Sequence, residues 1–314
     1  MDGGGSEIAG SGSALDARSP QAAAILHLFT QSLVVCGAIF FLVVALIVVC
    51  VVLFRSRPGR EASRTDGDKR LEIGWTLVPS GVLIWLLVAT ARAMTVADPT
   101  ADRPPDLTVV AHQWWWEARY PSGAVAANEI HVPAGRPLVV RIESADVVHD
   151  FWAPSLGRKI DAIPGRAVTV WLQADRPGIY LGTCAEYCGA EHAWMRIRVV
   201  AQTPAAFTAW EAHERLAASA PSGAAAARGA RMFGAKTCVG CHAIRGTDET
   251  RVGPDLTHLA ERATLATGAI DNNPSELARW LKDPQRIKPG CHMPNLQLAD
   301  GEVNDLVAYL ETLR

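Results

Sequence analysis

The feature that most constrains the fold is a run without a single charged residue, from Ser32 to Phe54. A bilayer is spanned by about 20 apolar residues, so this run is long enough to cross one. A second apolar run, from Trp75 to about Ala91, is shorter but still sufficient. We therefore predict a transmembrane hairpin over residues 22–98, with spans at about 32–54 and 75–96.

Each run has an alternative interpretation. The first has the hydrophobicity of a secretory signal, but it is too long, and its basic cluster follows instead of preceding it. The second is compatible with a buried core helix. The residues between the runs include Arg55, Arg57, Arg60, Arg64, Lys69 and Arg70. Positive charge between spans favours the cytoplasmic side, so both flanks are expected outside.

Cysteine positions argue against a simple disulfide framework. Of 7 cysteines, Cys36 and Cys50 lie in the apolar run, two close pairs lie downstream, and Cys291 is left over. Close pairs with an odd cysteine favour metal or heme attachment. The formal net charge of -2 gives no reason to expect a nucleic-acid partner. Residues 1–21 are rich in Gly, Ser and Ala, and we expect them to be flexible.

Residues 106–202 read as a β domain. Short β-rich runs are separated by turn signals such as Pro121-Ser122-Gly123 and Arg176-Pro177-Gly178. The runs are Leu107–Trp116, Pro137–Glu143, Ala167–Gln173, Gly178–Thr183 and Trp194–Ala201. Several short strands without an intervening helix pattern predict a β-sandwich or barrel.

One loop of this domain carries a metal-ligand pattern: Cys184, Cys188, His192 and Met195. The spacing is too compact for a zinc finger, and sulfur mixed with imidazole suits copper. His149 is the upstream candidate for a second imidazole. Alone, however, it would be interpreted as a structural histidine. A disulfide between the two cysteines is the alternative, but it leaves His192 and Met195 unexplained.

Two further features are ambiguous from the residues alone. Trp114, Trp115 and Trp116 are adjacent, which is more typical of packing than of electron transfer. If they lie in one strand their rings point to both faces, so at least one is exposed or at an interface. Glu72 precedes the second apolar run by three residues. Such a carboxylate is usually a solvated flank, although ionisable groups there also mark ion paths.

The C-terminal region, residues 224–314, follows a helical linker at 203–223. Cys238-Val239-Gly240-Cys241-His242 is the signature of covalently attached c-type heme, with His242 as axial ligand. A redox Cys-x-x-Cys is the alternative, but the βαβ setting is absent. Flanking helices are expected over Ala224–Phe233 and Gly301–Leu313, with Asp300 as an N-cap.

The second axial ligand of such a heme is expected from a stiff loop, Lys288 to Pro294. Met293 is the only methionine downstream of the heme signature, and methionine raises a heme potential. His292 is the rival ligand. Cys291 in the same loop is either a small filler or a site of oxidation.

The N-terminal two thirds of the chain resembles subunit II of heme-copper cytochrome c oxidases, over nearly all of residues 14–202. The resemblance rests on C-A-E-Y-C-G-A-E-H-A-W-M, on D-V-V-H-D-F-W-A-P, on H-Q-W-W-W-E and on the apolar hairpin. It implies a cupredoxin-like domain with a binuclear copper centre, CuA. The implied ligands are His149, Cys184, Cys188, His192, Met195 and the backbone carbonyl of Glu186.

The same resemblance implies three more roles. The Glu186 side chain would contribute to a magnesium site shared with subunit I. Trp114 would be the aromatic residue that receives electrons near the copper, and Glu72 would stand at the entrance of a proton channel. The run around Asp161 is similar to the surface that meets subunit I.

Residues 224–314 resemble a class I cytochrome c, in which the proline of Val252-Gly253-Pro254-Asp255-Leu256 accepts a hydrogen bond from the axial histidine. The fusion resembles subunit II of a caa3-type oxidase, a multidomain two-pass protein of a bacterial plasma membrane. Expected partners are subunits I and III and a cytochrome donor. Electrons would pass through heme c and CuA to subunit I, where oxygen is reduced and protons are pumped. The alternatives are a copper-containing nitric oxide reductase and a stand-alone electron carrier.

Overall fold

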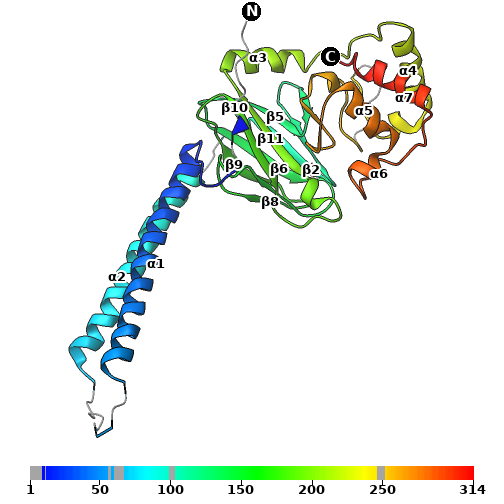
Figure 1. Ribbon diagram of the computed structural model, residues 1–314. Helices are drawn as coiled ribbons and strands as arrows, with labels where there is room; N and C mark the ends of the chain where they lie inside the picture. Colours follow the sequence, from blue (N-terminus) through cyan, green and yellow to red (C-terminus); the bar gives the residue numbers. More distant parts are fainter. Residues whose placement is uncertain (1–8, 11, 56–57, 60–66, 99–102, 246–251) are drawn as a thin grey trace, which may run out of the picture. The chain divides into compact units, whose positions relative to one another are not determined.

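The computed structural model describes residues 9–10, 12–55, 58–59, 67–98, 103–245 and 252–314 (Figure 1). The predicted flexible residues 1–8 and three of the loop arginines, Arg57, Arg60 and Arg64, lie outside the described residues. The chain forms two compact units, Met1–Ala22 with Thr100–Arg314, and Ala23–Pro99. Each is described by itself below.

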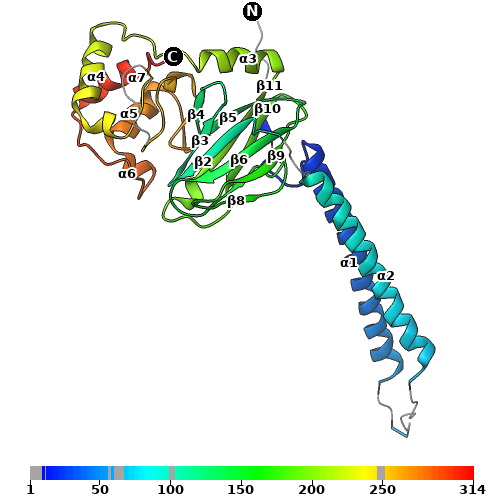
Figure 2. The same cartoon turned by 180° about the vertical axis from the view of Figure 1, so that it is seen from behind.

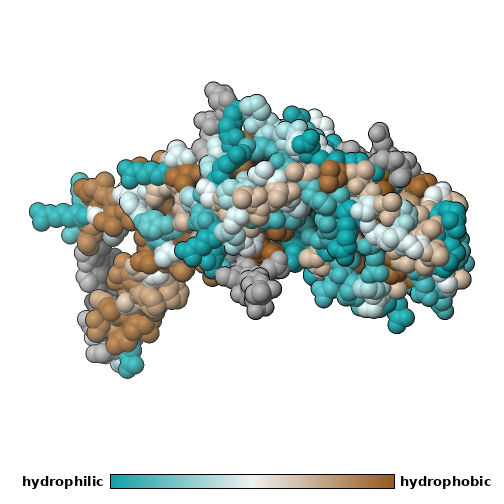
Figure 3. Space-filling view, turned by 90° about the horizontal axis from the view of Figure 1, so that it is seen from above, coloured by the Kyte–Doolittle hydropathy of each residue, from teal (hydrophilic) through white to brown (hydrophobic). Residues whose placement is uncertain are grey.

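The smaller unit is a helical hairpin of α1 (Pro20–Leu53) and α2 (Lys69–Ala97). Both helices are long and apolar enough to cross a membrane, and both begin earlier than the predicted spans. Large apolar side chains of both helices are exposed, among them Phe41 at 71%, and Figure 3 shows apolar side chains on the face of the hairpin that it presents. A helix that is hydrophobic on every face needs an apolar environment, which supports the predicted hairpin.

The larger unit begins with a sandwich of two β-sheets (Figure 2). One sheet has the order β4-β3-β2-β6-β9, and the other the order β5-β11-β10-β7-β8. The first comprises β2 (Leu107–His112), β3 (Trp115–Arg119), β4 (Val125–Ala127), β6 (Leu138–Ser144) and β9 (Val168–Leu172). The second comprises β5 (Glu129–Pro133), β7 (His149–Trp152), β8 (Ile160–Ala162), β10 (Gly178–Cys184) and β11 (Arg196–Gln202). This confirms the β-sandwich.

Side chains that alternate along the strands fill the space between the sheets. In β11, Ile197, Val199 and Ala201 are buried while their neighbours are more exposed. Trp116 and Ile142 are fully buried in the same core. Burying one such large apolar side chain contributes roughly 1.5–3 kcal/mol, so the core holds the strand ends that carry the site.

Three details of the sandwich correct the sequence analysis. The predicted strand Leu107–Trp116 is two strands, because β2 ends at His112 and β3 begins at Trp115. Trp114 therefore lies in the connecting turn. The strands β4, β5, β7 and β8 were missed, since they are short or contain polar residues. Ala9 and Gly10, expected to be flexible, form β1 and pair with β10.

The C-terminal domain is mainly helical. It also contains a short antiparallel hairpin of two-residue strands, β12 (Thr264–Leu265) and β13 (Ile270–Asp271). Its helices are α4 (Ala224–Ala235), α5 (Pro274–Lys282), α6 (Pro284–Ile287) and α7 (Asp300–Leu310), with one-turn helices η2 (Thr237–Gly240) and η3 (Leu259–Glu261). The predicted linker contains α3 (Pro204–His213). Gly229 lets α4 approach α7 closely, since a Cβ there would lie 2.0 Å from the Asp305 carbonyl oxygen.

The predicted N-cap of the last helix was placed one residue late. Ala299 is the N-cap of α7, and Asp300 is its first residue. The Glu302 carboxylate accepts a hydrogen bond of 2.9 Å from the Ala299 N–H. Glu302 therefore satisfies a free N–H at the helix start, as the third residue of a capping box does.

A buried carboxylate in the sandwich makes a pH-dependent contribution to stability. Burial opposes ionisation of Glu117, but hydrogen bonds from His112 and Arg119 outweigh it and lower its pKa to about 2. A depressed pKa stabilises the fold above pH 4.5, and that stabilisation is lost as the pH falls toward 2. Its size at neutral pH is at most about 3 kcal/mol.

Glu117→Gln is therefore expected to lower the unfolding free energy at pH 7 and to flatten its decline in acid. Urea unfolding at pH 7, 4 and 3 measures both effects. Glu143→Gln, a partly exposed carboxylate in the same sheet, is the matched control. Parallel pH profiles for Glu117→Gln and the unsubstituted chain would contradict the prediction.

Candidate functional site

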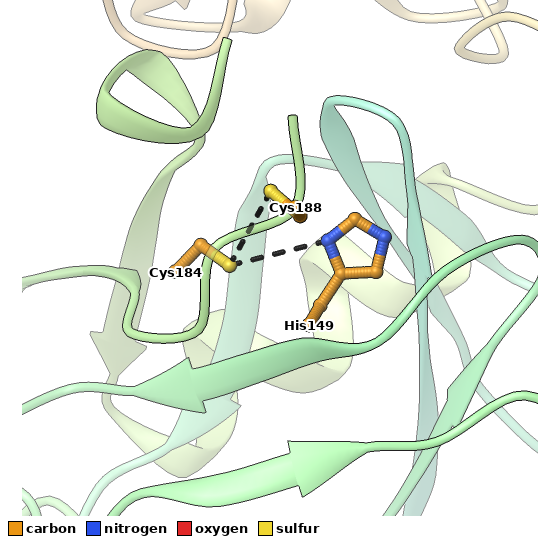
Figure 4. A group of neighbouring side chains, drawn as sticks. All are labelled: His149, Cys184 and Cys188. Atoms are coloured by element: carbon orange, nitrogen blue, oxygen red, sulfur yellow. Dashed lines mark hydrogen bonds between the residues drawn. The ribbon is translucent and has the colours of Figure 1, made fainter. Parts of the chain in front are cut away.

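The structure brings the predicted copper-binding side chains together (Figure 4). Cys184 Sγ lies 3.8 Å from Cys188 Sγ and 3.9 Å from His149 Nδ1. Cys188 Sγ lies 3.6 Å from His192 Nδ1 and 3.8 Å from Met195 Sδ. The Glu186 carbonyl oxygen lies 3.2 Å from Cys184 Sγ. A sulfur separation of 3.8 Å is far beyond a disulfide bond, so the two thiols remain free.

Strand pairing explains why residues distant in sequence meet here. β7 and β10 are antiparallel neighbours, with Cys184 opposite Phe151, so His149 is close to the end of β10. The loop then returns through η1 (His192–Trp194), and the Cys184 N–H donates to the Met195 carbonyl oxygen at 2.9 Å. The loop is thereby closed on itself.

Asp146 fixes the orientation of the His149 ring from the side opposite Cys184. Its Nε2 lies 2.8 Å from Asp146 Oδ1, a carboxylate acceptor, so Nε2 carries the proton. The unprotonated Nδ1 then faces Cys184, as expected of a metal-ligating histidine with a carboxylate partner. His149 has no exposed surface, and Cys184 and Cys188 are each only 3% exposed.

The two thiols share one negative charge. The hydrogen bond from Cys188 lowers the pKa of Cys184 to about 3, and the resulting thiolate raises the pKa of Cys188. Full deprotonation of both needs a compensating cation. A buried cage of two thiols, two imidazoles, a thioether and a carbonyl therefore fits soft or borderline metal ions, and copper in particular.

Carboxylates near the cage differ in their surroundings. The Glu186 side chain is exposed, and no carboxylate, imidazole or thiol of the described residues forms a metal-binding group with it. Asp150, next to His149, is 1% exposed and faces Asp161 across β7 and β8. Burial and the hydrogen bond with Asp161 raise the pKa of Asp150 to about 7.

The heme-signature residues line a cavity of about 470 Å³. Its walls include Cys238, Cys241, His242 and Met293 and are otherwise mainly apolar, among them Phe233, Leu281 and Leu306. The volume and apolar lining are typical of a cofactor site. Cys238 and Cys241 are free thiols, so both remain available for attachment of a heme.

His242 is held for axial ligation as predicted. Its Nδ1 donates to the Pro254 carbonyl oxygen at 2.8 Å, so Nε2 carries the lone pair. Burial lowers the pKa of His242, which keeps the ring neutral. The Gly253 backbone lies against the ring, and a Cβ there would be 2.8 Å from Cε1. Gly253 is therefore needed for the ring position.

The loop from Lys288 to Pro294, which carries Met293, is held in place by the side-chain amide of Gln285. Its Nε2 donates to the carbonyl oxygens of Cys291, at 2.9 Å, and Met293, at 2.8 Å. Both Met293 and His292 line the cavity, so the rivalry between them stays open. Burial raises the pKa of Cys291, which leaves its thiol protonated and less reactive. Cys291 thus belongs to the cavity wall.

Met293→Ala is expected to lower the heme midpoint potential by on the order of 0.1 V, because a thioether ligand favours the reduced iron. A redox titration of the heme c band measures the shift. His292→Ala is the matched control in the same loop and should leave the potential nearly unchanged. The opposite result, with only His292→Ala shifting it, would identify His292 as the ligand.

Trp114 joins the cavity to the copper cage. Its Nε1 donates to the Cys188 carbonyl oxygen at 3.0 Å, and its ring centroid lies 4.8 Å from that of His292. Trp114 also lines the heme cavity and is 8% exposed. Gln113 Nε2 donates to the same Cys188 carbonyl at 2.8 Å.

Polar contacts hold the domains together here, and the sequence analysis missed the two that involve buried charged side chains. Lys288 Nζ, from the C-terminal domain, donates to the Trp114 carbonyl oxygen at 2.9 Å and to Thr267 Oγ1 at 2.7 Å. Glu129 on β5 accepts from the N–H groups of Ala263 and Thr264 at 3.0 Å. Lys288 and Glu129 are 4% and 6% exposed. No local pattern marks either residue, because the partner in the other domain lies more than 130 positions away in both cases.

Comparison with known proteins agrees with this division of the chain. The family model of the cytochrome c oxidase subunit II transmembrane domain matches residues 11–91, and that of its periplasmic domain matches 124–202. The cytochrome c model matches 226–314. Cytochrome c oxidase subunit 2 of Alkalihalophilus pseudofirmus is 34% identical, covering 96% of this chain and 90% of that protein. This chain belongs to the cytochrome c oxidase subunit 2 family.

Other members of the subunit 2 family match as well. The Bacillus subtilis protein is 32% identical over 83% of this chain and 80% of its own length. The crystal structure of the periplasmic domain of subunit II from Bradyrhizobium japonicum is 31% identical over 37% of this chain, with a TM-score of 0.35. As a subunit 2 family member with a C-terminal cytochrome c domain, the chain is part of an oxidoreductase, a terminal oxidase.

Glu72, which the sequence analysis singled out, lies in the first turn of α2, in the hairpin unit.

Proposed function

We propose that this chain is the electron-input subunit of a caa3-type cytochrome c oxidase. One cytochrome domain and one copper-binding domain lie in the same chain, and Trp114 contacts both sites. That contact is the observation that carries the proposal. A c-type heme and a CuA pair, when bound, supply the one-electron redox chemistry.

The residues of the chain position these groups and connect them. Cys238 and Cys241 would attach the heme, and His242, oriented by Pro254, would ligate its iron together with Met293. The copper pair would be held by the side chains of His149, Cys184, Cys188, His192 and Met195 and by the carbonyl of Glu186. Because Trp114 donates its indole N–H to Cys188, it offers a short covalent and hydrogen-bonded route between the two sites.

The partner of the copper domain is proposed to be subunit I, where oxygen would be reduced and protons pumped, with subunit III in the same complex. A donor cytochrome would deliver electrons to the heme c. Glu72 is proposed to stand at the entrance of a proton channel, and the exposed Glu186 carboxylate to contribute to magnesium at the subunit I surface. By the positive-inside rule, the basic residues between α1 and α2 favour a cytoplasmic position for this loop. Both domains would then be extracytoplasmic.

The experiment that tests this function is native purification of the complex, followed by oxygen uptake with reduced cytochrome c. We expect a heme-copper subunit I to co-purify and oxygen uptake to depend on this chain. Nitric oxide reduction without oxygen reduction would support the alternative reductase. A chain that purifies alone from intact membranes, with full redox function, would contradict the oxidase assignment.

A further inference from the structure

A second cluster of metal-ligating side chains lies away from both redox sites. His213 is the last residue of α3, His258 precedes η3, and Glu261 ends it. Their ligand atoms all lie within 4.8 Å of one another, and the two imidazole centroids are 4.8 Å apart. None of these residues belongs to the predicted copper or heme ligands, so the redox function does not explain the cluster.

Unsatisfied nitrogen atoms mark the cluster as a site. His258 is 3% exposed; the Leu216 backbone is a polar neighbour of its ring, but neither ring nitrogen has a hydrogen bond of normal geometry among the described residues. Leaving buried polar atoms unpaired destabilises a fold. A bound ligand that accepts electron pairs from the imidazole would remove that cost.

The third residue faces the same point. His213 Nε2 lies 3.1 Å from Glu261 Oε1, yet the nitrogen is not in a hydrogen bond with it. The nitrogen and the carboxylate oxygen are therefore close without being hydrogen-bonded to each other, which leaves both available to a cation. The two side chains are 38% and 34% exposed, while the His213 Nε2 atom itself is buried, so the site lies just beneath the surface.

Both cations and acids surround the cluster, and the acids outnumber the cations by three to two. Arg262 and Arg245 are the neighbouring cations, and Glu214 and Asp255 are the neighbouring acids besides Glu261. Arg245 is directed elsewhere, since its guanidinium donates to the carbonyl oxygens of Arg215 and Gly123. Arg262 likewise donates to the Asp255 carbonyl oxygen. Neither guanidinium therefore occupies the space between the three candidate ligands.

We propose that His213, His258 and Glu261 form a binding site for a divalent cation of the zinc class. Two imidazoles and one carboxylate are a zinc ligand set that leaves a position for water. The site joins α3, which follows the copper domain, to the loop that carries Pro254. The Pro254 carbonyl oxygen orients His242, the proposed heme ligand. An ion bound here would therefore fix the linker helix α3 to the loop that positions this ligand.

The test uses the purified oxidase complex with its copper and heme in place. Zinc is added at increasing concentration, bound zinc is measured by equilibrium dialysis and elemental analysis, and its ligands by X-ray absorption at the zinc edge. The complex is expected to bind one more zinc ion than the His258→Ala variant, with imidazole nitrogen in the difference spectrum. Glu261→Gln should weaken binding by about 10- to 100-fold or more.

Two controls keep the result interpretable. Glu276→Gln, which removes a carboxylate on α5 that pairs with Arg279, should leave zinc binding unchanged. The heme c and copper bands report folding of each variant. If His258→Ala loses its heme, His213→Asn and Glu261→Gln decide instead. Unchanged zinc stoichiometry and affinity in the folded variants would show that the cluster is only structural and would overturn the proposal.

Discussion

His149→Ala is expected to abolish the spectrum of an electron shared between two copper ions while leaving the heme c band intact. His149 is fully buried, and its Nδ1 faces Cys184 because Asp146 accepts a hydrogen bond from Nε2. Alanine removes one ligand and leaves Asp146 without its partner. Copper then loses the nitrogen that makes the two ends of the cage alike, and oxygen uptake of the complex should fall to background.

Copper content, the near-infrared band and the electron paramagnetic resonance spectrum together measure this effect. His131→Ala is the matched control, because it removes a half-buried imidazole from β5 of the same sandwich, where His131 stacks on Trp210. That variant should retain the copper spectrum. A His149→Ala protein with an unchanged mixed-valence spectrum would exclude His149 from the ligands. Loss of both the copper and heme spectra would indicate misfolding.

The side chains proposed to bind copper could be named from the sequence because chemistry restricts copper ligands to a few residue types at close spacing. Cys184, Cys188, His192 and Met195 lie within twelve positions, so a short loop brings them together in any fold. His149 is different, since 35 positions separate it from Cys184. It was named as the upstream candidate for a second imidazole, the resemblance implied it as a ligand, and the pairing of β7 with β10 supplies the physical reason why it lies near Cys184.

The strand pattern around the tryptophans could not be resolved in the same way. Residues 107–116 are nearly all apolar or aromatic, so period-two alternation gives no sign of a turn. Gln113 and Trp114 form that turn because the Gln113 N–H donates to the Asp146 carboxylate, 33 positions away. Local propensity carries no information about such a distant partner.

The contacts between the copper and cytochrome domains were invisible for a related reason. Lys288 was interpreted only as the start of a stiff loop, and Glu129 was not considered at all. Each becomes notable only when it is buried by another domain, where a charged group must find hydrogen bonds. Burial and distant partners are tertiary properties, and neither has a periodicity that a sequence can display.

Trp114→Phe is expected to slow electron transfer from heme c to copper by at least about tenfold, which equals about 1.4 kcal/mol in apparent barrier. Phenylalanine keeps a ring in the buried space but cannot donate to the Cys188 carbonyl oxygen, as the indole does at 3.0 Å. The direct bonded link between the cavity wall and the copper loop is lost. The heme c potential should stay unchanged, because His242 and Met293 are untouched.

The measurement is the rate of heme c oxidation after flash reduction of the complex, compared with Trp171→Phe, a tryptophan on β9 of the same sandwich. Trp171→Phe should leave the rate unaltered.

Lys288→Met tests whether slower electron transfer results from loosened contact between the domains or from loss of the route through the Trp114 indole. Lys288 bonds to the backbone oxygen of Trp114, so Trp114→Phe leaves this contact in place, and Lys288→Met leaves the indole in place. Losing a hydrogen bond from a charged group costs about 1.5–3 kcal/mol, which lowers the ratio of docked to undocked domain by about 10- to 100-fold. A route through Trp114 predicts a slow single phase in Trp114→Phe, whereas domain release predicts a second, variable phase in Lys288→Met. If neither variant slows heme oxidation, electrons reach copper by a path that avoids Trp114.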